Sequence, residues 1–421
     1  MAVRHCIRAR ELAGLLALAC ITAGPLGAGE MTLEVAAGET DRVEAPVCAE
    51  IALPADLAET PPAKLAAALE GPEGKTPGQL LPSSEKGKAL LWWTVSLKAG
   101  QKATYRAAIQ KDAPPGKSFA FQDEPGKSLD LTFDGRKVAR LMYAHDFSTK
   151  EKRFETYKVF THVFDSKGER LITNGHGQPF PHHRGIFIGW NRTALPDGKT
   201  RYDFWHMPVA CQRLDRFAAQ DAGPVLGRLT AVVNWEDPQG KPVLVEERQI
   251  TVYRQSRPDL LLDFVSTLRS GQGDIALDGD PEHAGCQFRA HSDLGDLYKK
   301  LKPAELKEQG KETRYLLPPG MKEGTKGTPD MPWASVALSL GEQRFGVAQL
   351  NHPGNPKGTI YSANRAYGRF GAFAKATVKA DAPLVLRYRF FVREGPEALT
   401  ADDVQRLYAD FAKPPEATAR P

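Results

Sequence analysis

The sequence contains little cysteine, with five residues in 421 positions. Two of the five fall in an N-terminal segment described below. The other three, Cys48, Cys211 and Cys286, are too few and too widely spaced for a disulfide scaffold. One bridge between Cys211 and Cys286 is an open interpretation, because both lie in the histidine-bearing region. Three buried free thiols are the alternative.

Long apolar runs and blocks of one charge are also missing. No stretch after the first 28 residues approaches the ~20 apolar residues of a membrane helix, so we expect a soluble chain without an integral membrane segment. Acidic and basic residues are interspersed, and the basic arm that a phosphate backbone requires is absent, which argues against nucleic acid as a partner. The composition, 41% hydrophobic and 25% charged, excludes disorder, and the length allows two packed domains.

The first 28 residues are typical of a secretory signal peptide. Arg4, Arg8 and Arg10 form a basic start, residues 12–23 form an apolar core, and small residues follow. We therefore expect export to the periplasm or the extracellular space. The stretch before Cys20 is similar to a lipoprotein site, but its leucine lies one place too far from the cysteine, so ordinary cleavage is favoured over lipid anchoring.

Strand-like segments separated by Gly and Pro turns predict a mostly β fold. We expect a small β-sandwich domain over residues 29–112, a linker with adjacent prolines over residues 111–117, and a large antiparallel β-sandwich over residues 117–414. Residues 64–70 have a helical composition and are interpreted as an insertion between strands. Residues 415–421 are expected to be a tail, and the Lys- and Glu-rich residues 299–326 a mobile surface excursion.

The last strand and helix of the large domain have the clearest patterns. Residues 384–393 alternate apolar side chains with Arg387, Arg389 and Arg393, so the arginine face should be solvated or line a polar cleft. Thr400 begins a capping-box pattern, and an apolar stripe at helical spacing follows it. This predicts a short C-terminal helix that packs on a sheet.

Residues 174–184 hold three histidines, an arginine and two amides in eleven positions. Histidine has a proton affinity near working pH, so a cleft lined by several can supply both a general acid and a general base. The chain has ten histidines, and seven of them lie from this stretch onwards: His176, His182, His183, His206, His283, His291 and His352.

The same imidazoles could instead hold a divalent metal. The ligands would come from His182, His183, His206 and His291, with Asp203 or Glu282 as an oxygen ligand. Neighbouring side chains on an extended chain point to opposite faces, which argues against a simple metal motif at the adjacent pair. No other cofactor is expected.

Several polar and aromatic residues around this stretch are candidates for substrate binding. Arg184 could clamp a carboxylate or pair with Asp203, and the Asn351-His352 pair ends a strand before a Pro/Gly turn. If residues 282–291 form one continuous strand, the alternation of side chains places His283, Gln287, Arg289 and His291 on one face of the sheet. The remaining candidates are Asn174, Trp205 and His206.

The chain contains five distinctive motifs, Lys-Val-Phe-Thr-His-Val-Phe-Asp from residue 158, Leu-Ile-Thr-Asn-Gly from 171, Pro-His-His-Arg-Gly from 181, Asp-Phe-Trp from 203 and Asn-His-Pro-Gly-Asn-Pro from 351. Together they resemble the PmoA-like domain family of exported bacterial proteins. The family has no known function, and its "methane oxygenase" label receives no support from a chain without membrane helices. The family in turn resembles the galactose-mutarotase-like β-supersandwich, whose members act on sugars through histidines and carboxylates on a concave sheet.

The leading hypothesis is therefore an exported carbohydrate-active enzyme, an epimerase, lyase or hydrolase. His182 or His183 would transfer the proton, with His291 and His352 as partners, and Arg184, Asn351 and Asp203 would position a substrate. Two alternatives stay open, a metal-dependent and perhaps oxidative enzyme on the same histidines, and a non-catalytic glycan-binding or envelope protein. The sequence does not determine the oligomeric state.

Overall fold

The computed structural model describes residues 30–111, 116–396 and 399–420, and it confirms the mostly β fold. All strand pairs in the described residues for which a register is defined are antiparallel, as expected of strands joined by hairpins. The signal-peptide prediction and the centre of the predicted linker fall outside the described residues. No helix in the described ranges is long and apolar enough to cross a membrane.

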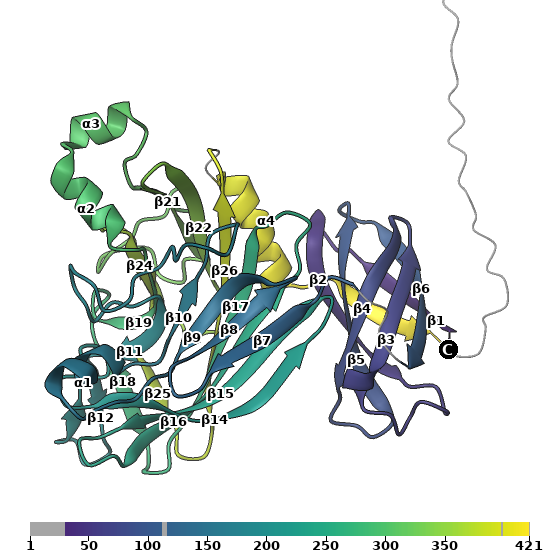
Figure 1. Ribbon diagram of the computed structural model, residues 1–421, viewed down its shortest axis with the longest axis horizontal. Coiled ribbons are helices and arrows are strands. Elements are labelled where there is room, and N and C mark those ends of the chain that lie inside the picture. The colour runs from purple at the N-terminus through teal and green to yellow at the C-terminus, as the bar shows by residue number, and fades with distance from the viewer. Residues whose placement is uncertain (1–29, 112–115, 397–398, 421) are drawn as a thin grey trace, which may run out of the picture.

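The N-terminal part is a seven-stranded sheet with a hydrophobic core of its own, drawn in purple and blue in Figure 1 except for the yellow C-terminal strand. In β5 every second side chain is buried and Trp93 is fully enclosed, which is the period of a strand with one face on a core. In spatial order the strands are β2 (Arg42–Ala52), β5 (Lys88–Leu97), β4 (Gly74–Pro82), β3 (Leu65–Gly71), β6 (Lys102–Lys111), β1 (Glu30–Ala36) and β27 (Glu416–Arg420), with the short 3-10 helix η1 (Pro62–Lys64) before β3.

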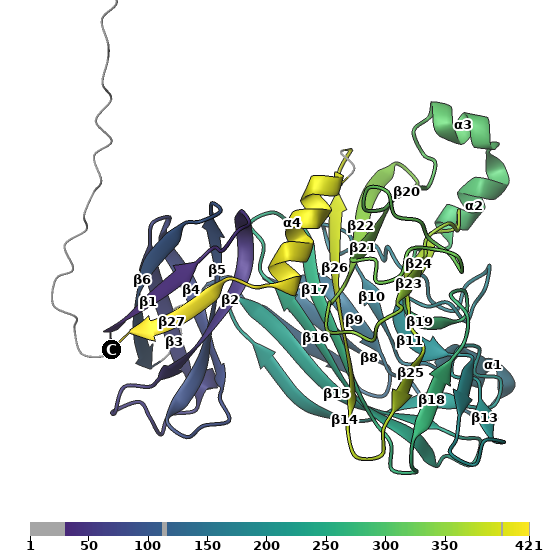
Figure 2. The same cartoon turned by 180° about the vertical axis from the view of Figure 1, so that it is seen from behind.

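Two expectations about this part are wrong. Residues 65–71 form strand β3, because Leu65 and Leu69 enter the core and the ladders to β4 and β6 outweigh the helical preference of alanine. Residues 416–420, expected in the tail, form β27 and pair with β1. The C-terminal chain thus returns to the N-terminal sheet, as Figure 2 shows.

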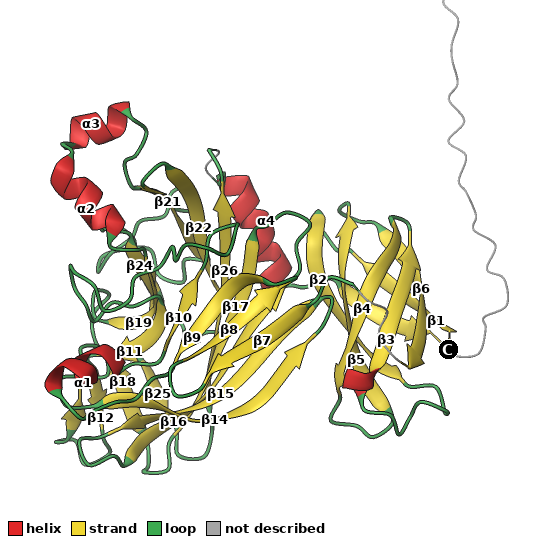
Figure 3. Cartoon of the chain, viewed as in Figure 1, coloured by secondary structure: helices red, strands yellow, loops and turns green. Residues whose placement is uncertain are grey.

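The remaining strands form two eight-stranded sheets and a four-stranded sheet (Figure 3). The first large sheet contains β23 (Ile360–Ser362), β24 (Arg369–Phe373), β19 (Ala284–Arg289), β11 (Ile186–Trp190), β10 (Phe160–Val163), β9 (Arg136–Met142), β8 (Ser128–Phe133) and β7 (Phe119–Glu124). The second contains β14 (Cys211–Ala222), β15 (Leu226–Glu236), β16 (Pro242–Tyr253), β17 (Leu260–Arg269), β26 (Leu384–Glu394), β22 (Gln343–Asn351), β21 (Trp333–Leu340) and β20 (Arg314–Leu316).

The two large sheets share one hydrophobic core, to which Ile188 of β11 and Phe264 of β17 both contribute. This is the arrangement of a β-sandwich. The small sheet contains β13 (Arg201–Tyr202), β12 (Arg192–Ala194), β18 (Ile275–Asp278) and β25 (Ala376–Val378), and the α-helices are α1 (Lys150–Thr156), α2 (Asp293–Lys300), α3 (Pro303–Glu308) and α4 (Ala401–Ala412). Part of the predicted surface excursion is therefore ordered as the end of α2, α3 and β20.

The C-terminal helix is confirmed, and the arginine face of β26 is buried at Arg389, whereas Arg387 and Arg393 are half-buried. Thr400 accepts from the N–H of Asp403, and the Asp403 carboxylate accepts from the N–H of Thr400 (3.0 Å), which completes the capping box of α4. Arg389 is 5% exposed, pairs with Asp263 at 2.6 Å, and stacks at 4.9 Å on Phe411 of α4. The helix covers this face and desolvates the ion pair.

The three described cysteines are free thiols, so the alternative of a bridge between Cys211 and Cys286 is wrong. Cys211 lies at the start of β14 in one large sheet and Cys286 in β19 of the other. Burial raises the pKa of Cys211 to about 12 and raises that of Cys286 well above its usual value. Both therefore behave as small apolar core residues.

Candidate active site

An open pocket of about 540 Å³ lies beside α1, where three chain segments meet. These segments are the helix itself, the loop that precedes β11, and the loop that follows β13. The volume suits a small ligand of one or two rings. The lining residues are Lys150, Arg153, Phe154, Tyr157, Pro181, His182, His206, Met207 and Pro208.

Four histidines form a continuous row in and behind this pocket. The ring centres of His183 and His182 are 4.1 Å apart, those of His182 and His206 are 4.5 Å apart, and those of His206 and His283 are 5.2 Å apart. The fold thus brings together three predicted residues and adds His283. We refer to these four residues as the histidine row.

Two members of the row are held by aspartates. The Nδ1 of His206 lies 2.8 Å from Asp203, and the Nδ1 of His283 lies 2.9 Å from Asp280. Burial alone would raise the pKa of Asp203, but hydrogen bonds from the side chain and backbone of His206 and from the Trp205 N–H bring it below its usual value. Asp203 is therefore a carboxylate, its oxygen accepts from Nδ1–H, and Nε2 of His206 is left as the acceptor.

The other two members are neutral. Burial first, and then the nearby positive charge of Lys158, lower the pKa of His182 to about 3. His183 is 3% exposed, and burial followed by the proximity of His182 holds its pKa well below the usual value. Neither ring nitrogen of His183 has a hydrogen-bond partner in the described structure, which leaves a buried polar ring with unmet bonding capacity.

A buried lysine fixes the backbone on which the row is built. The Nζ of Lys158 donates to the carbonyls of His182 (2.9 Å) and Trp205 (2.7 Å) and lies 4.4 Å from the ring centre of Phe187. Burial, followed by repulsion from Arg184, lowers its pKa well below the usual value. Lys158 therefore ties the loop before β11 to the loop after β13.

Exposed apolar side chains lie in the lining of the pocket or next to it in the chain. Of the five exposed large hydrophobic residues in the described chain, Phe154 is 41% exposed, Phe180 46% and Val209 55%, and Phe147 stacks under Arg153. Phe154 lines the pocket, while Phe180 and Val209 are sequence neighbours of lining residues. Exposed apolar surface gathered at one mouth is typical of a binding site.

Three predicted substrate-binding residues have structural contacts instead. Arg184 is fully buried and donates to the carbonyls of Phe154, Glu155 and Pro181, so it joins α1 to the histidine loop and cannot clamp a ligand or pair with Asp203. Asn174 is 1% exposed and donates to the Gly177 carbonyl, which shapes the loop. Trp205 is fully buried behind the row, so its ring offers no exposed face to a sugar.

His291 lies on the other side of the histidine loop, in a second pocket of about 230 Å³ shared with His162 and His176. Its Nδ1 is 3.2 Å from an oxygen of Asp293, and its ring makes no contact with the histidine row among the described residues. The β19 face is consequently divided. His283 enters the row, Gln287 and Arg289 are buried, and His291 lies apart.

His352 and Asn351 lie at a third location, under α4. The ring of His352 packs at 5.1 Å on Phe411, and its Nδ1 accepts from the Gly354 N–H (3.0 Å). Asn351 accepts from Asn355, whose amide also bonds the backbone of Arg387 in β26. The Asn-His-Pro-Gly-Asn motif therefore builds a turn that fastens β22 to β26.

The candidate metal ligands do not converge as predicted. His291 is separated from the other three, and the Nδ1 atoms of His206 and His283 bond to aspartates. Within the described ranges, no group of three or more His, Cys, Asp or Glu residues has the geometry to hold a metal ion. The arrangement instead suits proton transfer and hydrogen bonding.

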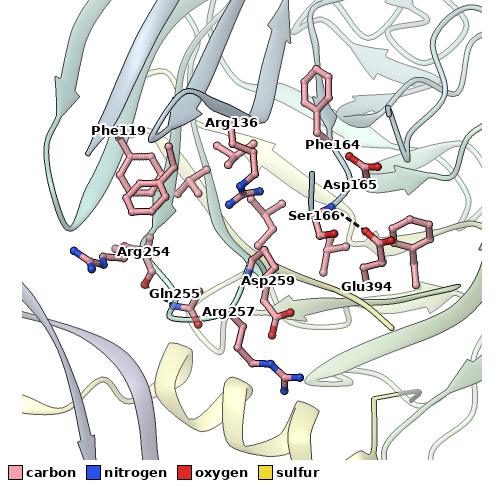
Figure 4. Close-up of a pocket in the computed structure, with 18 residues that line it drawn as sticks. Phe119, Arg136, Phe164, Asp165, Ser166, Arg254, Gln255, Arg257, Asp259 and Glu394 are labelled. Atoms are coloured by element: carbon pink, nitrogen blue, oxygen red, sulfur yellow. Dashed lines mark hydrogen bonds between the residues drawn. The ribbon is translucent and has the colours of Figure 1, made fainter. Parts of the chain in front are cut away.

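A further pocket, shown in Figure 4, is too small for an organic ligand. It holds about 20 Å³, and it lies between strands of the two large sheets. Two of its carboxylates are already used, since Glu394 accepts from the Ser166 N–H (2.9 Å) and Asp259 pairs with Arg393 (3.1 Å). We assign it no ligand.

Sequence reasoning missed one signal that was available. Asp203 and His206 have the spacing Asp-x-x-His, and Asp280 and His283 repeat it. Two residues lie between the aspartate and the imidazole in each pair, a spacing that lets the carboxylate orient the ring within one turn. The contributions of Lys158 and of the residues around α1 carry no comparable pattern.

Comparison with known proteins places the chain by family only. Residues 128–409 match the family of unknown function DUF6807, and the chain belongs to this family. The match gives no support for the PmoA-like or galactose-mutarotase-like names. No curated protein matches the chain.

Proposed function

We propose, for this member of a family without a known function, an exported carbohydrate-active enzyme that uses histidine acid–base chemistry on a sugar or glycan. The observation that carries the proposal is the Asp203–His206 pair in the wall of the open pocket. The side chain of His206 is 38% exposed, so its free Nε2 is accessible to a ligand. A neutral imidazole oriented by a carboxylate is suited to act as a general base and then return the proton as an acid.

The neighbouring His182 supports this role for His206. Because its pKa is about 3, His182 is uncharged at neutral pH and does not oppose protonation of His206. Its ring, 4.5 Å away, can hydrogen-bond a substrate hydroxyl. His182 is therefore proposed to bind and orient the substrate, and His206 to move the proton.

The apolar mouth supports a sugar as the substrate class. Phe154, Pro181, Met207 and Pro208 line the pocket beside polar imidazoles. A pyranose ring likewise has an apolar C–H face and polar edges, so both kinds of surface are matched.

Proton transfer at carbon fits this pocket better than glycoside hydrolysis. Most glycosidases act through two carboxylates that flank the scissile bond. No aspartate or glutamate lines the 540 Å³ pocket in the described structure, and Asp203 is directed at His206. Epimerisation or β-elimination is therefore favoured over hydrolysis.

The test is turnover of a panel of acidic and neutral glycans by the purified chain and by His206→Gln and His182→Gln. Loss of the general base should lower kcat by about 10²-fold or more, and loss of His182 should mainly raise KM. His352→Gln is the matched control, because that ring packs under α4 and should leave turnover unchanged. Unaltered turnover in both test variants would overturn the proposal.

Binding without any product on this panel would favour the alternative of a non-catalytic glycan-binding protein. The metal-dependent alternative predicts stoichiometric metal in protein purified without chelator, together with loss of turnover on its removal. Elemental analysis of the active preparation therefore separates the three functions.

A further inference from the structure

The pocket is lined by cationic and neutral groups and by no carboxylate. Lys150 and Arg153 lie at its mouth, and His182 and His206 lie inside. The carboxylates near Lys150 and Arg153 along the chain have other partners, since Glu151 accepts from the Thr149 hydroxyl, Asp146 pairs with Lys152 (2.9 Å) and Glu155 faces His176 (3.7 Å) in the second pocket. The charge of the lining therefore favours an anionic ligand.

Arg153 is held by two hydrogen bonds that leave some of its N–H donors unused. Its Nη2 donates to the carbonyls of Met207 (3.2 Å) and Ala210 (3.0 Å), and its guanidinium stacks on Phe147 at 5.0 Å. The Nε and Nη1 atoms have no protein partner in the described structure. A guanidinium fixed in this manner can donate its free N–H groups to the carboxylate of a ligand. Lys150 likewise forms no ion pair with a described residue, and it adds a second positive charge to the pocket lining.

The groups in and behind the lining add a second argument. Burial is the main cause of the depressed pKa values of Lys158 and His182, and nearby positive charges lower both further, that of Arg184 acting on Lys158 and that of Lys158 acting on His182. An anion in the pocket would offset this smaller electrostatic contribution, whereas a neutral sugar would not. Phe154 in the pocket lining and the nearby Phe180 are exposed, so a ligand with an apolar face could pack against them.

We propose that the ligand is a uronic acid, a sugar whose carboxylate is bound by Arg153 and Lys150 while His206 reaches the adjacent C5–H. This inference rests on the proposed function and specifies its substrate. A neutral pyranoside has no carbon acid within reach of an imidazole. In a uronate, the carboxylate acidifies the C5 proton, so histidine chemistry and the cationic mouth require the same substrate.

The reaction balances without an oxidant or other co-reactant. Nε2 of His206 takes the C5 proton, and the electron pair of the C5–H bond moves into the carboxylate, whose added charge Arg153 and Lys150 offset. That pair then forms the C4=C5 double bond while the C4–O4 bond breaks. The proton passes from His206 to the departing O4, which restores the neutral imidazole.

The same geometry favours elimination over epimerisation. Epimerisation needs a second, protonated group on the opposite face of C5, and His182 is neutral at working pH. Elimination on one face needs a single group that takes and returns the proton. The Asp203–His206 pair supplies one such group.

The experiment compares matched sugars on the purified full chain. Oligomers of galacturonate, glucuronate and mannuronate are each tested beside their neutral hexose counterparts and a sulfated neutral oligomer. Product is followed by ultraviolet absorbance of the C4=C5 bond conjugated to the carboxylate, and by mass spectrometry for the absence of added water. We expect conversion of at least one uronate oligomer to an unsaturated product and no conversion of neutral or sulfated sugars.

Variants test the carboxylate contact. Lys150→Gln should lower kcat/KM for the uronate by about threefold or more, because Lys150 both binds the carboxylate and offsets its added charge, and the effect is modest because the ion pair would be exposed. Lys152→Gln on the same helix is the control, since Lys152 pairs with Asp146 and does not line the pocket. Equal effects of the two variants would contradict the contact.

The outcomes separate this inference from the proposed function. Conversion of neutral or sulfated sugars, or products with added water, would overturn the uronate inference and leave a carbohydrate-active enzyme. No conversion of any sugar would overturn both. Conversion of uronates that persists in His206→Gln would overturn the assignment of the base.

Discussion

At the scale of single residues, the role of a histidine in this protein depends on its hydrogen-bond partner. His206 and His283 are oriented by aspartates, whereas His182 and His183 are neutral and His183 has no partner. The same type of side chain thus has different hydrogen-bond partners at each position in the row. The difference between oriented and unoriented imidazoles can be tested directly.

Asp203→Asn should abolish most activity while preserving the fold. An amide at this position can donate to Nδ1 of His206, which moves the ring proton to Nε2 and removes the acceptor. We expect kcat to fall by about 10²-fold or more, with a stability loss of about 1–2 kcal/mol from the weakened hydrogen bonds. Kinetics and urea unfolding measure the two effects, and nitrogen NMR of His206 reports the tautomer.

Asp280→Asn is the matched control for this prediction, because it makes the same change at His283, which does not line the pocket. A larger loss of kcat in Asp280→Asn than in Asp203→Asn would reassign the base to His283.

At the scale of elements, α1 is a seven-residue helix that forms one wall of the pocket. A helix of this length is not stable alone, so its position depends on tertiary contacts. Arg184 provides them, through carbonyl hydrogen bonds to Phe154 and Glu155 and a stack on Tyr157 at 4.3 Å. A residue first interpreted as substrate-binding therefore positions the wall.

Arg184→Met should loosen α1 and weaken ligand binding without removing a ligand contact. We expect a stability loss of about 3 kcal/mol, because buried carbonyls lose their donors, and faster hydrogen exchange of the α1 amides. Lys152→Met on the same helix is the control and should change stability by less than about 0.5 kcal/mol. Unchanged exchange in α1 would contradict the positioning role.

At the scale of the whole molecule, the first and last strands of the described residues pair in one sheet. β27 pairs with β1, and Asp410 of α4 pairs with Arg42 of β2 at 2.9 Å, both side chains being 3% exposed. The large sandwich is in this manner fastened to the N-terminal sheet. The interior of the large sandwich also contains neutral histidines, which make the free energy of unfolding depend on pH.

Stability should fall on mild acidification. Burial first, and then Arg140, lower the pKa of His162 to about 3, against an ordinary value of 6.5. Below pH 6.5 the unfolded chain binds a proton that the folded chain does not bind until about pH 3. Unfolding is therefore favoured progressively as pH falls through this window, by roughly 1.4 kcal/mol per pH unit for each such histidine at most.

Urea unfolding between pH 7.5 and pH 4 measures this effect. His162→Gln should flatten the dependence by up to one proton, because the group that distinguishes the two states is removed. An identical slope in the variant would show that His162 is already protonated in the fold or remains solvated.

The sequence by itself determined the strand content, the long β-hairpins and the capped C-terminal helix, and it indicated residues 174–184 as a candidate site. These features follow from periodicity and local hydrogen bonding, which depend on neighbours in the chain. It misassigned residues 65–71, because alanine's helical preference is weaker than a ladder on each side. It also could not place residues 416–420 in a sheet formed with the opposite end of the chain.

Only the tertiary structure decided which histidines lie next to one another. His182, His183, His206 and His283 come from three loops whose distance depends on the register of β11, β18 and β19 and on the buried Lys158. His291, which follows β19, lies in the second pocket, and His352, which follows β22, packs under α4. The sequence supplied the imidazoles, and the packing of strands far apart in the chain placed His206 beside its aspartate, beside the ring of His182 and at the pocket that Lys150 and Arg153 line.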